Sequence, residues 1–243
     1  MNGNPPTIGI VTALELERGW IGSANEACMV DVGGVGRTRA EAATARLLAR
    51  GAAAVVSWGI AGGLDPDLES GTVIVPECVI DADRARWHAD SGWRDRLLGR
   101  IGHLVAISGD PMLHADAVVA SPADKRDLHR RWRAVATDME SAAVARVAED
   151  AGVPWLVVRV IGDAADQELP KSVTELSDEN GRLRSGAVAR LVFRPRLWPT
   201  LLRLGITNAA AGRSMRRVWA AAGPDLALSV GRIRASGGSS DRE

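Results

Sequence analysis

Residues 155–161 read WLVVRVI and are followed directly by Gly162 and Asp163. A continuous run rich in Val and Ile that closes at Gly, Pro or Asp is typical of a strand buried on both faces of a sheet. We therefore predict a buried parallel strand here. Runs of the same kind predict further strands at residues 8–13, 53–58, 72–75 and 118–120.

Helical patterns separate these runs. Residues 37–50 carry apolar side chains at helical spacing and end at Gly51, while residues 138–151 open with acidic side chains and end before Gly152. Strands and helices in alternation predict a mostly parallel, mixed central sheet with helices on both faces. The expected fold class is therefore α/β, built as a three-layer sandwich.

The size and charge of the chain limit its organisation and its partners. Its 243 residues, 46% of them hydrophobic, suffice for one large α/β domain. We expect a catalytic domain over residues 1–185, a basic amphipathic helical extension over 186–222 and a disordered tail over 223–243. Thirty basic residues balance thirty acidic ones, so no global field attracts the protein to nucleic acid.

Cysteine and histidine usage predicts an intracellular protein without a disulfide framework or a zinc site. Cys28 and Cys78 are too few for a disulfide framework and form no CxxC pair. The sequence shows no secretory pattern, and no apolar run approaches the ~20 residues of a spanning helix. We therefore expect a cytoplasmic protein. The four histidines lack zinc-site spacing, so we expect neither a metal nor a cofactor.

Four groups of residues fall where open parallel sheets bind ligands, at strand ends and helix starts. They are Glu15 with Glu17, the segment 59–63 (GIAGG), the segment 138–140 (DME) and Asp163. Each has a simpler explanation, since acids favour helix N-termini, glycines allow a tight strand exit and Asp caps turns. Their coincidence on one edge favours a carboxylate site. Paired carboxyl groups suit glycosidic bonds, where one protonates the leaving group and another activates water.

Six segments together resemble the purine nucleoside phosphorylase superfamily, and especially its methylthioadenosine/S-adenosylhomocysteine nucleosidase branch. They are 8–17 (IGIVTALELE), 33–37 (GGVGR), 59–64 (GIAGGL), 108–110 (SGD), 138–141 (DMES) and 159–166 (RVIGDAAD). The resemblance covers roughly residues 7–170. It implies a nucleoside phosphorylase-like fold and an enzyme, either a purine nucleosidase or a nucleoside phosphorylase.

The resemblance also implies roles for single residues. Glu17 matches the glutamate that polarises the attacking water, Glu140 the one that binds a sugar hydroxyl, and Asp163 the aspartate that protonates the purine at N7. The implied substrate contacts are Met139 beneath the ribose, Ala61 and Gly62 at the glycine turn, and Met112 and Leu113 beside the purine. A free Asp has a pKa of about 3.9, so that of Asp163 must be raised by burial or by a neighbouring carboxylate.

Two positions depart from the family pattern. Ile60 stands where the family usually carries Ser or Thr, and Gly162 where a Ser commonly steadies the acid, so we expect Asp163 to be held differently. The turn around Gly59 also lacks the residues with which the phosphorylases bind phosphate, which favours water as the nucleophile. Arg37 keeps a phosphate-dependent phosphorylase as an alternative. A nucleoside-binding protein without catalysis is another, because one fold hosts many functions.

The segment 190–219 is basic and amphipathic, inside a stretch, 180–224, without Asp or Glu. Its apolar stripe comprises Trp198, Leu201, Leu202, Ile206 and Ala209. Such a segment suits the anionic inner face of a membrane, or equally a helix that packs on the core or on another subunit. Together with the turn at 59–63 it resembles the hopanoid-synthesis branch, whose members remove adenine from adenosylhopane. That resemblance implies a lipid-linked purine nucleoside and peripheral membrane contact, and the wider family implies a homodimer.

Overall fold

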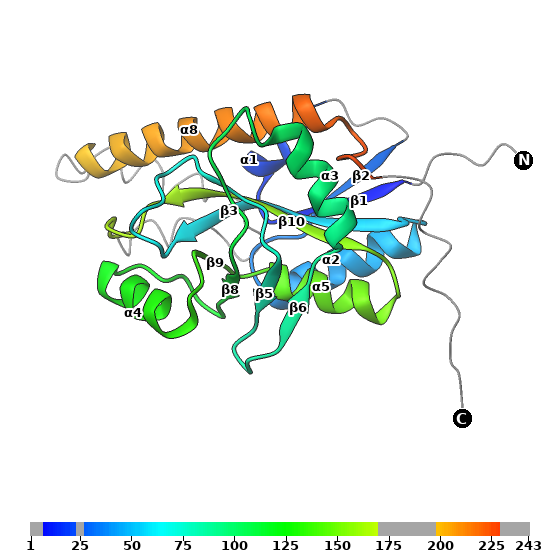
Figure 1. The fold of residues 1–243 in the computed structure, drawn as a ribbon, viewed down its shortest axis with the longest axis horizontal. Helices are drawn as coiled ribbons and strands as arrows, with labels where there is room; N and C mark the ends of the chain where they lie inside the picture. Colours follow the sequence, from blue (N-terminus) through cyan, green and yellow to red (C-terminus); the bar gives the residue numbers. More distant parts are fainter. Residues whose placement is uncertain (1–6, 23–26, 170–197, 229–243) are drawn as a thin grey trace, which may run out of the picture.

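A large mixed sheet with helices on both faces forms the body of the protein (Figure 1). The computed structural model describes residues 7–22, 27–169 and 198–228, the last range with side chains from residue 209 onward. The strands are β1 (Ile8–Thr12), β2 (Cys28–Val32), β3 (Ala54–Gly63), β4 (Val73–Ile74), β5 (Cys78–Ile80), β6 (Arg86–His88), β7 (Ile107–Ser108), β8 (Met112–His114), β9 (Ala136–Asp138) and β10 (Trp155–Asp163). The helices are α1 (Glu15–Arg18), α2 (Arg37–Ala49), α3 (Ser91–Ile101), α4 (Pro122–Trp132), α5 (Ser141–Asp150) and α8 (Trp198–Ala222).

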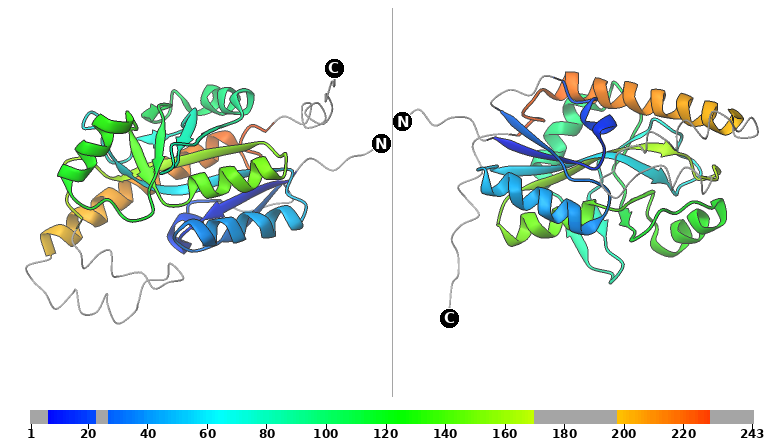
Figure 2. Two further views of the ribbon diagram at one scale, coloured as in Figure 1. Left: turned by 90° about the horizontal axis from the view of Figure 1, so that it is seen from below. Right: turned by 180° about the vertical axis from the view of Figure 1, so that it is seen from behind.

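The two longest strands, β3 and β10, form the centre of the sheet. They run parallel, with Trp155 opposite Val55, and every residue of β10 is buried. β1 adds to the other side of β3 in parallel, while β4 and β9 pair antiparallel with β10 and β3. Helices α2 and α5 pack together on one face, and α3 and α8 cover the other (Figures 1 and 2). The predicted α/β class and the layers are confirmed.

Several predicted boundaries differ from the structure. Residues 118–120 are a loop, not a strand, because their segment finds no partner strand and Val118 is 48% exposed. The helix predicted from residue 138 begins at Ser141, since Asp138 is still paired in β9 with His114. The strands β5 to β9 have only two or three residues each, too few for a pattern to reveal them, and the apolar run of the five-residue β2 is interrupted by Asp31.

The C-terminal half of α8 packs on the core. Its inward face buries Ala211, Met215, Val218 and Ala222, and Trp219 meets Trp58 edge to face with ring centroids 6.2 Å apart. For these residues the core-packing explanation holds, and Arg213, Arg216 and Arg217 are exposed. Of the predicted apolar stripe, Ala209 is exposed and the other side chains lie outside the described residues, as do residues 186–197 of the predicted extension.

Residues 226–228, at the start of the predicted tail, pack on the core. Leu226 is fully buried, and its carbonyl accepts a bond of 2.7 Å from the indole N–H of Trp93. The carbonyl of Ala227 accepts from Arg96 at 3.1 Å. The apolar residues 226–228 thus gain packing and hydrogen bonds, and the rest of the tail lies outside the described residues.

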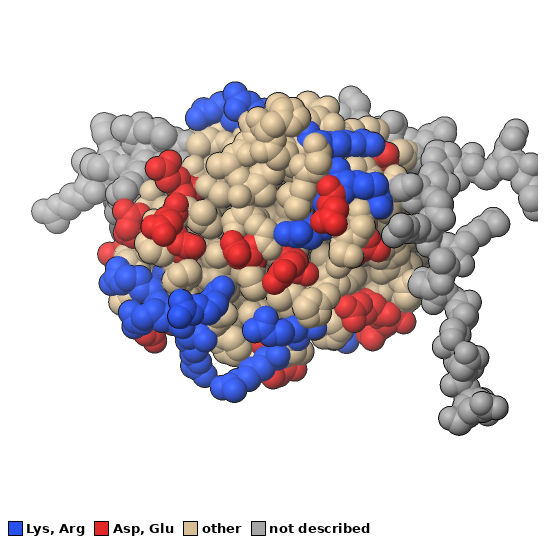
Figure 3. Space-filling view, viewed as in Figure 1, with Lys and Arg blue, Asp and Glu red and all other residues tan. Residues whose placement is uncertain are grey.

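Across the described part of the chain, no helix is both long and apolar enough to cross a membrane. The face shown in Figure 3 carries both signs of charge, and basic side chains gather over α4 and the β5–β6 hairpin. Arg84 and Arg131 there lie 5.9 and 5.4 Å from the ring centroid of Trp132.

Candidate active site

The three carboxylates singled out in the sequence line one cavity, of about 190 Å³. Glu17 reaches it from α1, Glu140 from the residue that precedes α5, and Asp163 from the end of β10. Its remaining lining residues are Ala13, Leu14, Val35, Ile60, Ala61, Gly62, Ala117, Val118, Val119, Thr137, Asp138, Met139 and Leu169. The strand ends and helix starts therefore converge as expected for an open parallel sheet.

Glu17 joins the ends of β1 and β3. Its Oε2 accepts backbone N–H bonds from Ala13 (2.8 Å) and Leu14 (2.9 Å), and its Oε1 accepts one from Ile60 (2.8 Å). A Cβ at Gly59 would lie 2.3 Å from Oε1, so only glycine permits this approach. Burial raises the pKa of Glu17, against the opposing effect of Arg159 and of these backbone bonds.

Glu140 caps the start of α5 and faces the glycine turn before α2. Its Oε1 accepts a bond of 2.8 Å from the backbone N–H of Gly36, and its Oε2 accepts one of 3.2 Å from Arg159. Burial raises the pKa of Glu140 to about 7, opposed by Arg159 and reinforced by the neighbouring carboxylate of Asp138. This group therefore changes charge near neutral pH.

The raised pKa of Glu140 predicts a pH-dependent stability. The carboxyl group titrates near 4.5 when unfolded and near 7 when folded. The folded protein therefore binds this proton more tightly in between, and the free energy of unfolding falls as the pH rises from about 4.5 to 7. In Glu140→Gln we expect the free energy of unfolding to fall less steeply with pH than in the wild type. Urea denaturation at several pH values measures this slope. Glu149→Gln, exposed at the end of the same helix, should keep the wild-type slope, and equal slopes in all three proteins would contradict the assignment.

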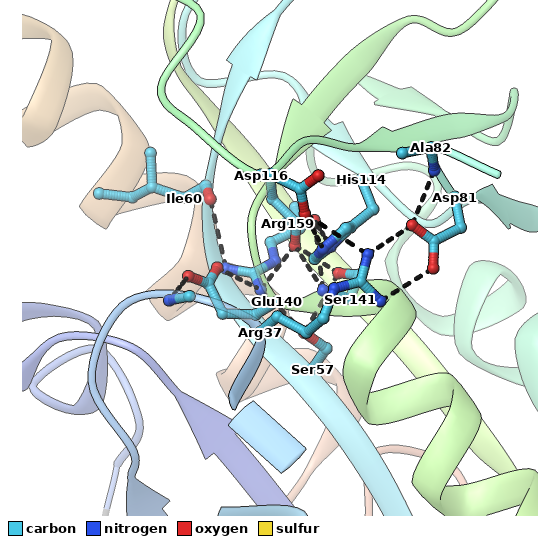
Figure 4. A network of polar contacts seen from close by, with 12 residues as sticks. Arg37, Ser57, Ile60, Asp81, Ala82, His114, Asp116, Glu140, Ser141 and Arg159 are labelled. Atoms are coloured by element: carbon cyan, nitrogen blue, oxygen red, sulfur yellow. Dashed lines mark hydrogen bonds and ion pairs between the residues drawn. The ribbon is translucent and has the colours of Figure 1, made fainter. Parts of the chain in front are cut away.

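Arg159 lies beneath the cavity and links the acids (Figure 4). Its guanidinium is 1% exposed and lies 2.7 Å from Asp138, 3.2 Å from Glu140 and 3.9 Å from Glu17. It also donates to Ser57 Oγ at 2.8 Å and to the carbonyl of Ile60 at 3.3 Å. No role for Arg159 was predicted from the sequence. The signal was a charged side chain inside an otherwise apolar strand, which must find partners when buried.

Asp163 is held by a lysine that the sequence did not reveal. The ammonium of Lys125, on α4, lies 2.5 Å from Asp163 Oδ2. Burial raises the pKa of Asp163, and Lys125 opposes that rise. The polar sequence of α4 carries no pattern that pairs Lys125 with Asp163, 38 residues away.

The two departures from the family pattern are physically linked. A Cβ at Gly162 would lie 2.6 Å from Cγ2 of Ile60, so Ile60 excludes any side chain at position 162. The pairing of β10 with β3 also shifts between Ile161 and Asp163. A bulge of this kind re-aims the following side chain, and Asp163 comes to lie opposite Gly62.

Some of the residues predicted to contact the substrate do not line the cavity. Ala61, Gly62 and Met139 line the cavity, but Met112 and Leu113 are buried in β8 outside its lining. The loop residues Ala117, Val118 and Val119 occupy the wall in their place. The structure places Met112 and Leu113 in the apolar core, on a strand that pairs with β5 and β9, so their contact with the purine stays a prediction.

Arg37, the predicted phosphate ligand, is engaged elsewhere. Its guanidinium donates to both oxygens of Asp81, at 2.5 and 2.9 Å, and lies 3.6 Å from Asp116 (Figure 4). The bond from Arg37 lowers the pKa of Asp81, which keeps this partner ionised. Within the described residues, Arg37 does not line the cavity.

The chain is similar to known proteins in sequence family and in fold. The family model described as the phosphorylase superfamily matches residues 8–194. The 5′-methylthioadenosine/S-adenosylhomocysteine nucleosidase of Neisseria meningitidis, in complex with methylthio-immucillin-A, is 18% identical with a TM-score of 0.63, covering 87% of this chain and 97% of that one. The Helicobacter pylori nucleosidase with 5′-methylthioadenosine in its active site is 18% identical with a TM-score of 0.65, covering 88% and 98%.

A futalosine hydrolase from Helicobacter pylori has the same fold, with 18% identity, a TM-score of 0.63 and coverage of 88% of this chain and 97% of that one. At such identities the likeness establishes the fold, while the family model supplies the relationship. The matched residues take in every described strand of the sheet together with Glu17, Glu140 and Asp163. We conclude that the chain belongs to the phosphorylase superfamily.

Proposed function

We propose that the protein hydrolyses the N-glycosidic bond of a purine nucleoside and releases the base, which we take to be adenine. The observation that carries this proposal is the convergence of Glu17, Glu140 and Asp163 on one cavity. Membership of the phosphorylase superfamily supports it. A binding protein would have no need for three buried carboxyl groups with raised pKa values, because each one is costly to bury.

The proposed chemistry assigns one role to each group. Glu17, held by three backbone N–H bonds, orients a water molecule and takes its proton as the oxygen attacks the sugar carbon. Asp163 gives a proton to the purine, so that the base leaves neutral. Glu140 accepts a hydrogen bond from a sugar hydroxyl, and the cationic sugar of the transition state is stabilised by the surrounding carboxylates.

The charges around the cavity favour water over phosphate as the nucleophile. Glu17, Asp138, Glu140 and Asp163 all line it, and Arg159 is shared among the first three. A phosphate dianion would be repelled by these three carboxylates, which share one cation. Arg37, the residue that a phosphorylase would need, is already paired with Asp81.

The cavity wall favours an apolar group at the 5′ carbon of the sugar. Leu14, Val35, Val118, Val119 and Leu169 all lie in the lining. Of these, Val118 is 48% exposed, so the apolar wall reaches the solvent. We therefore propose adenosylhopane as the substrate, with methylthioadenosine as the alternative. We also propose that the protein is a homodimer and that it contacts the membrane peripherally.

Adenine release with and without phosphate tests the reaction. The purified protein should release adenine from adenosylhopane without added phosphate, and the second product should be the lipid-linked ribose with a hydroxyl at its anomeric carbon. Dependence on phosphate, with a sugar phosphate as product, would instead establish a phosphorylase. Nucleoside binding without any cleavage would reject the enzymatic proposal. A strong preference for methylthioadenosine over adenosylhopane would reject the lipid substrate alone.

A further inference from the structure

Lys125 is the one buried residue of α4, a helix that the structure describes in full. Its side chain is 0% exposed, while Arg126 and Arg130 on the same helix are exposed. An apolar residue would anchor the helix without the large desolvation cost of removing an ammonium from water. Leu128 and Trp132 already supply the apolar contacts of α4 with the core, so a lysine at its one fully buried position calls for an explanation other than packing.

The ammonium of Lys125 is fully hydrogen-bonded. It donates to Asp163 Oδ2 at 2.5 Å, to the carbonyl of Ala164 at 2.9 Å and to the carbonyl of Gln167 at 2.9 Å. An ammonium has three N–H donors, so each donor has an acceptor among the described residues. This geometry fixes the nitrogen at one point, directly behind the carboxyl group that lines the cavity.

The residue that precedes Asp163 cannot replace Lys125 as a hydrogen-bond donor to the Asp163 carboxyl group. Gly162 bears no side chain, and a Cβ added there would lie only 2.6 Å from Ile60, which leaves no space for one. Lys125 is therefore the cation that faces Asp163 from the helix above it.

We propose that Lys125 is a positioning residue that fixes the Asp163 carboxyl group against the cavity and neutralises the carboxylate formed when Asp163 gives its proton to the leaving base. This inference rests on the proposed function. In the step, the O–H bond of Asp163 breaks and an N–H bond forms on the base, which keeps the electron pair of the broken glycosidic bond. The negative charge stays on Asp163, 2.5 Å from the ammonium. Since that charge is absent before the transfer, Lys125 stabilises the transition state more than the ground state.

The contact between Lys125 and Asp163 also sets the pH range in which the enzyme is active. Asp163 must be protonated to act, so kcat/KM falls as the pH rises through its pKa. Removing the ammonium raises that pKa and moves this limb to higher pH. The other charged groups at the cavity are Glu17 on α1, Asp138 on β9, Glu140 at the start of α5 and Arg159 on β10. These charged groups are all retained in a Lys125 variant. A difference between its pH profile of kcat/KM and that of the wild type therefore reports on Lys125.

Two variants test the inference. In Lys125→Met we expect kcat on the low-pH plateau to fall by about tenfold or more, with little change in KM, and the alkaline limb of kcat/KM to move up by about one pH unit or more. In Lys125→Gln, which keeps a donor but no charge, we expect the same shift of the limb with a smaller loss of kcat. Arg126→Met removes an exposed charge from the same helix and should change neither quantity.

Thermal unfolding separates a structural role from the proposed one. If Lys125→Met and Lys125→Gln lower the melting temperature but keep the limb and the kcat of the folded fraction, Lys125 only supports the fold and the inference is overturned. If Lys125→Met does not fold, Lys125→Gln provides the test. An alkaline limb of kcat/KM that moves to higher pH supports the inference, and an unchanged limb overturns it. A wild-type protein that cleaves no nucleoside overturns the proposed function and this inference with it.

Discussion

Replacing Asp163 with Asn is expected to lower kcat by about 10²- to 10⁴-fold while the protein stays folded. An amide cannot give a proton to the leaving base, so the glycosidic bond would have to break with negative charge left on the purine. The fold should persist because the amide oxygen of Asn can still accept the bond that Lys125 donates to Asp163 in the wild type. The measurement is adenine release under saturating substrate.

Asp166→Asn is the matched control, since Asp166 is exposed three residues further along the chain. Its kcat should equal that of the wild type. Near-normal turnover by Asp163→Asn would remove Asp163 from the chemistry. Loss of activity in both variants would point to a disturbed loop after β10 instead of a lost acid.

Replacing Arg159 with Met is expected to destabilise the fold by about 3–5 kcal/mol at neutral pH. Arg159 is the shared cation of three buried carboxylates, at 2.7 Å from Asp138, 3.2 Å from Glu140 and 3.9 Å from Glu17. Methionine fills much of the same space but leaves these charges uncompensated. Because protonation relieves their repulsion, the loss should be smaller near pH 5 than near pH 8. Urea denaturation at the two pH values measures both effects.

The control is Arg146→Met, which breaks a surface ion pair. Arg146 lies 2.6 Å from Glu41, with 42% of its side chain exposed. Exposed pairs contribute at most about 1 kcal/mol, so this variant should lose little at either pH. Equal losses in the two variants, or a loss in Arg159→Met that does not depend on pH, would contradict the role of Arg159 as the counter-ion of the buried acids.

Local patterns were enough to predict the layers and the edge at which the acids meet. Continuous apolar runs mark β3 and β10 because strands buried on both faces must be apolar throughout. Parallel strands end on one edge, so residues that follow them converge without any knowledge of their contacts. For this reason Glu17 and Asp163 could be assigned to one site although 146 residues separate them.

Pairwise contacts were decided only in three dimensions. The partners of Arg159, the pairing of Arg37 with Asp81 and the contact of Lys125 with Asp163 join residues on separate elements. No local periodicity encodes such a contact, because it depends on where two elements are placed by the packing of all the others. The same holds for residues 118–120, whose composition suits a strand but which have no partner strand, and of which Val118 and Val119 line the cavity. Composition therefore determined which side chains are available near the edge of the sheet, and packing determined which of them touch.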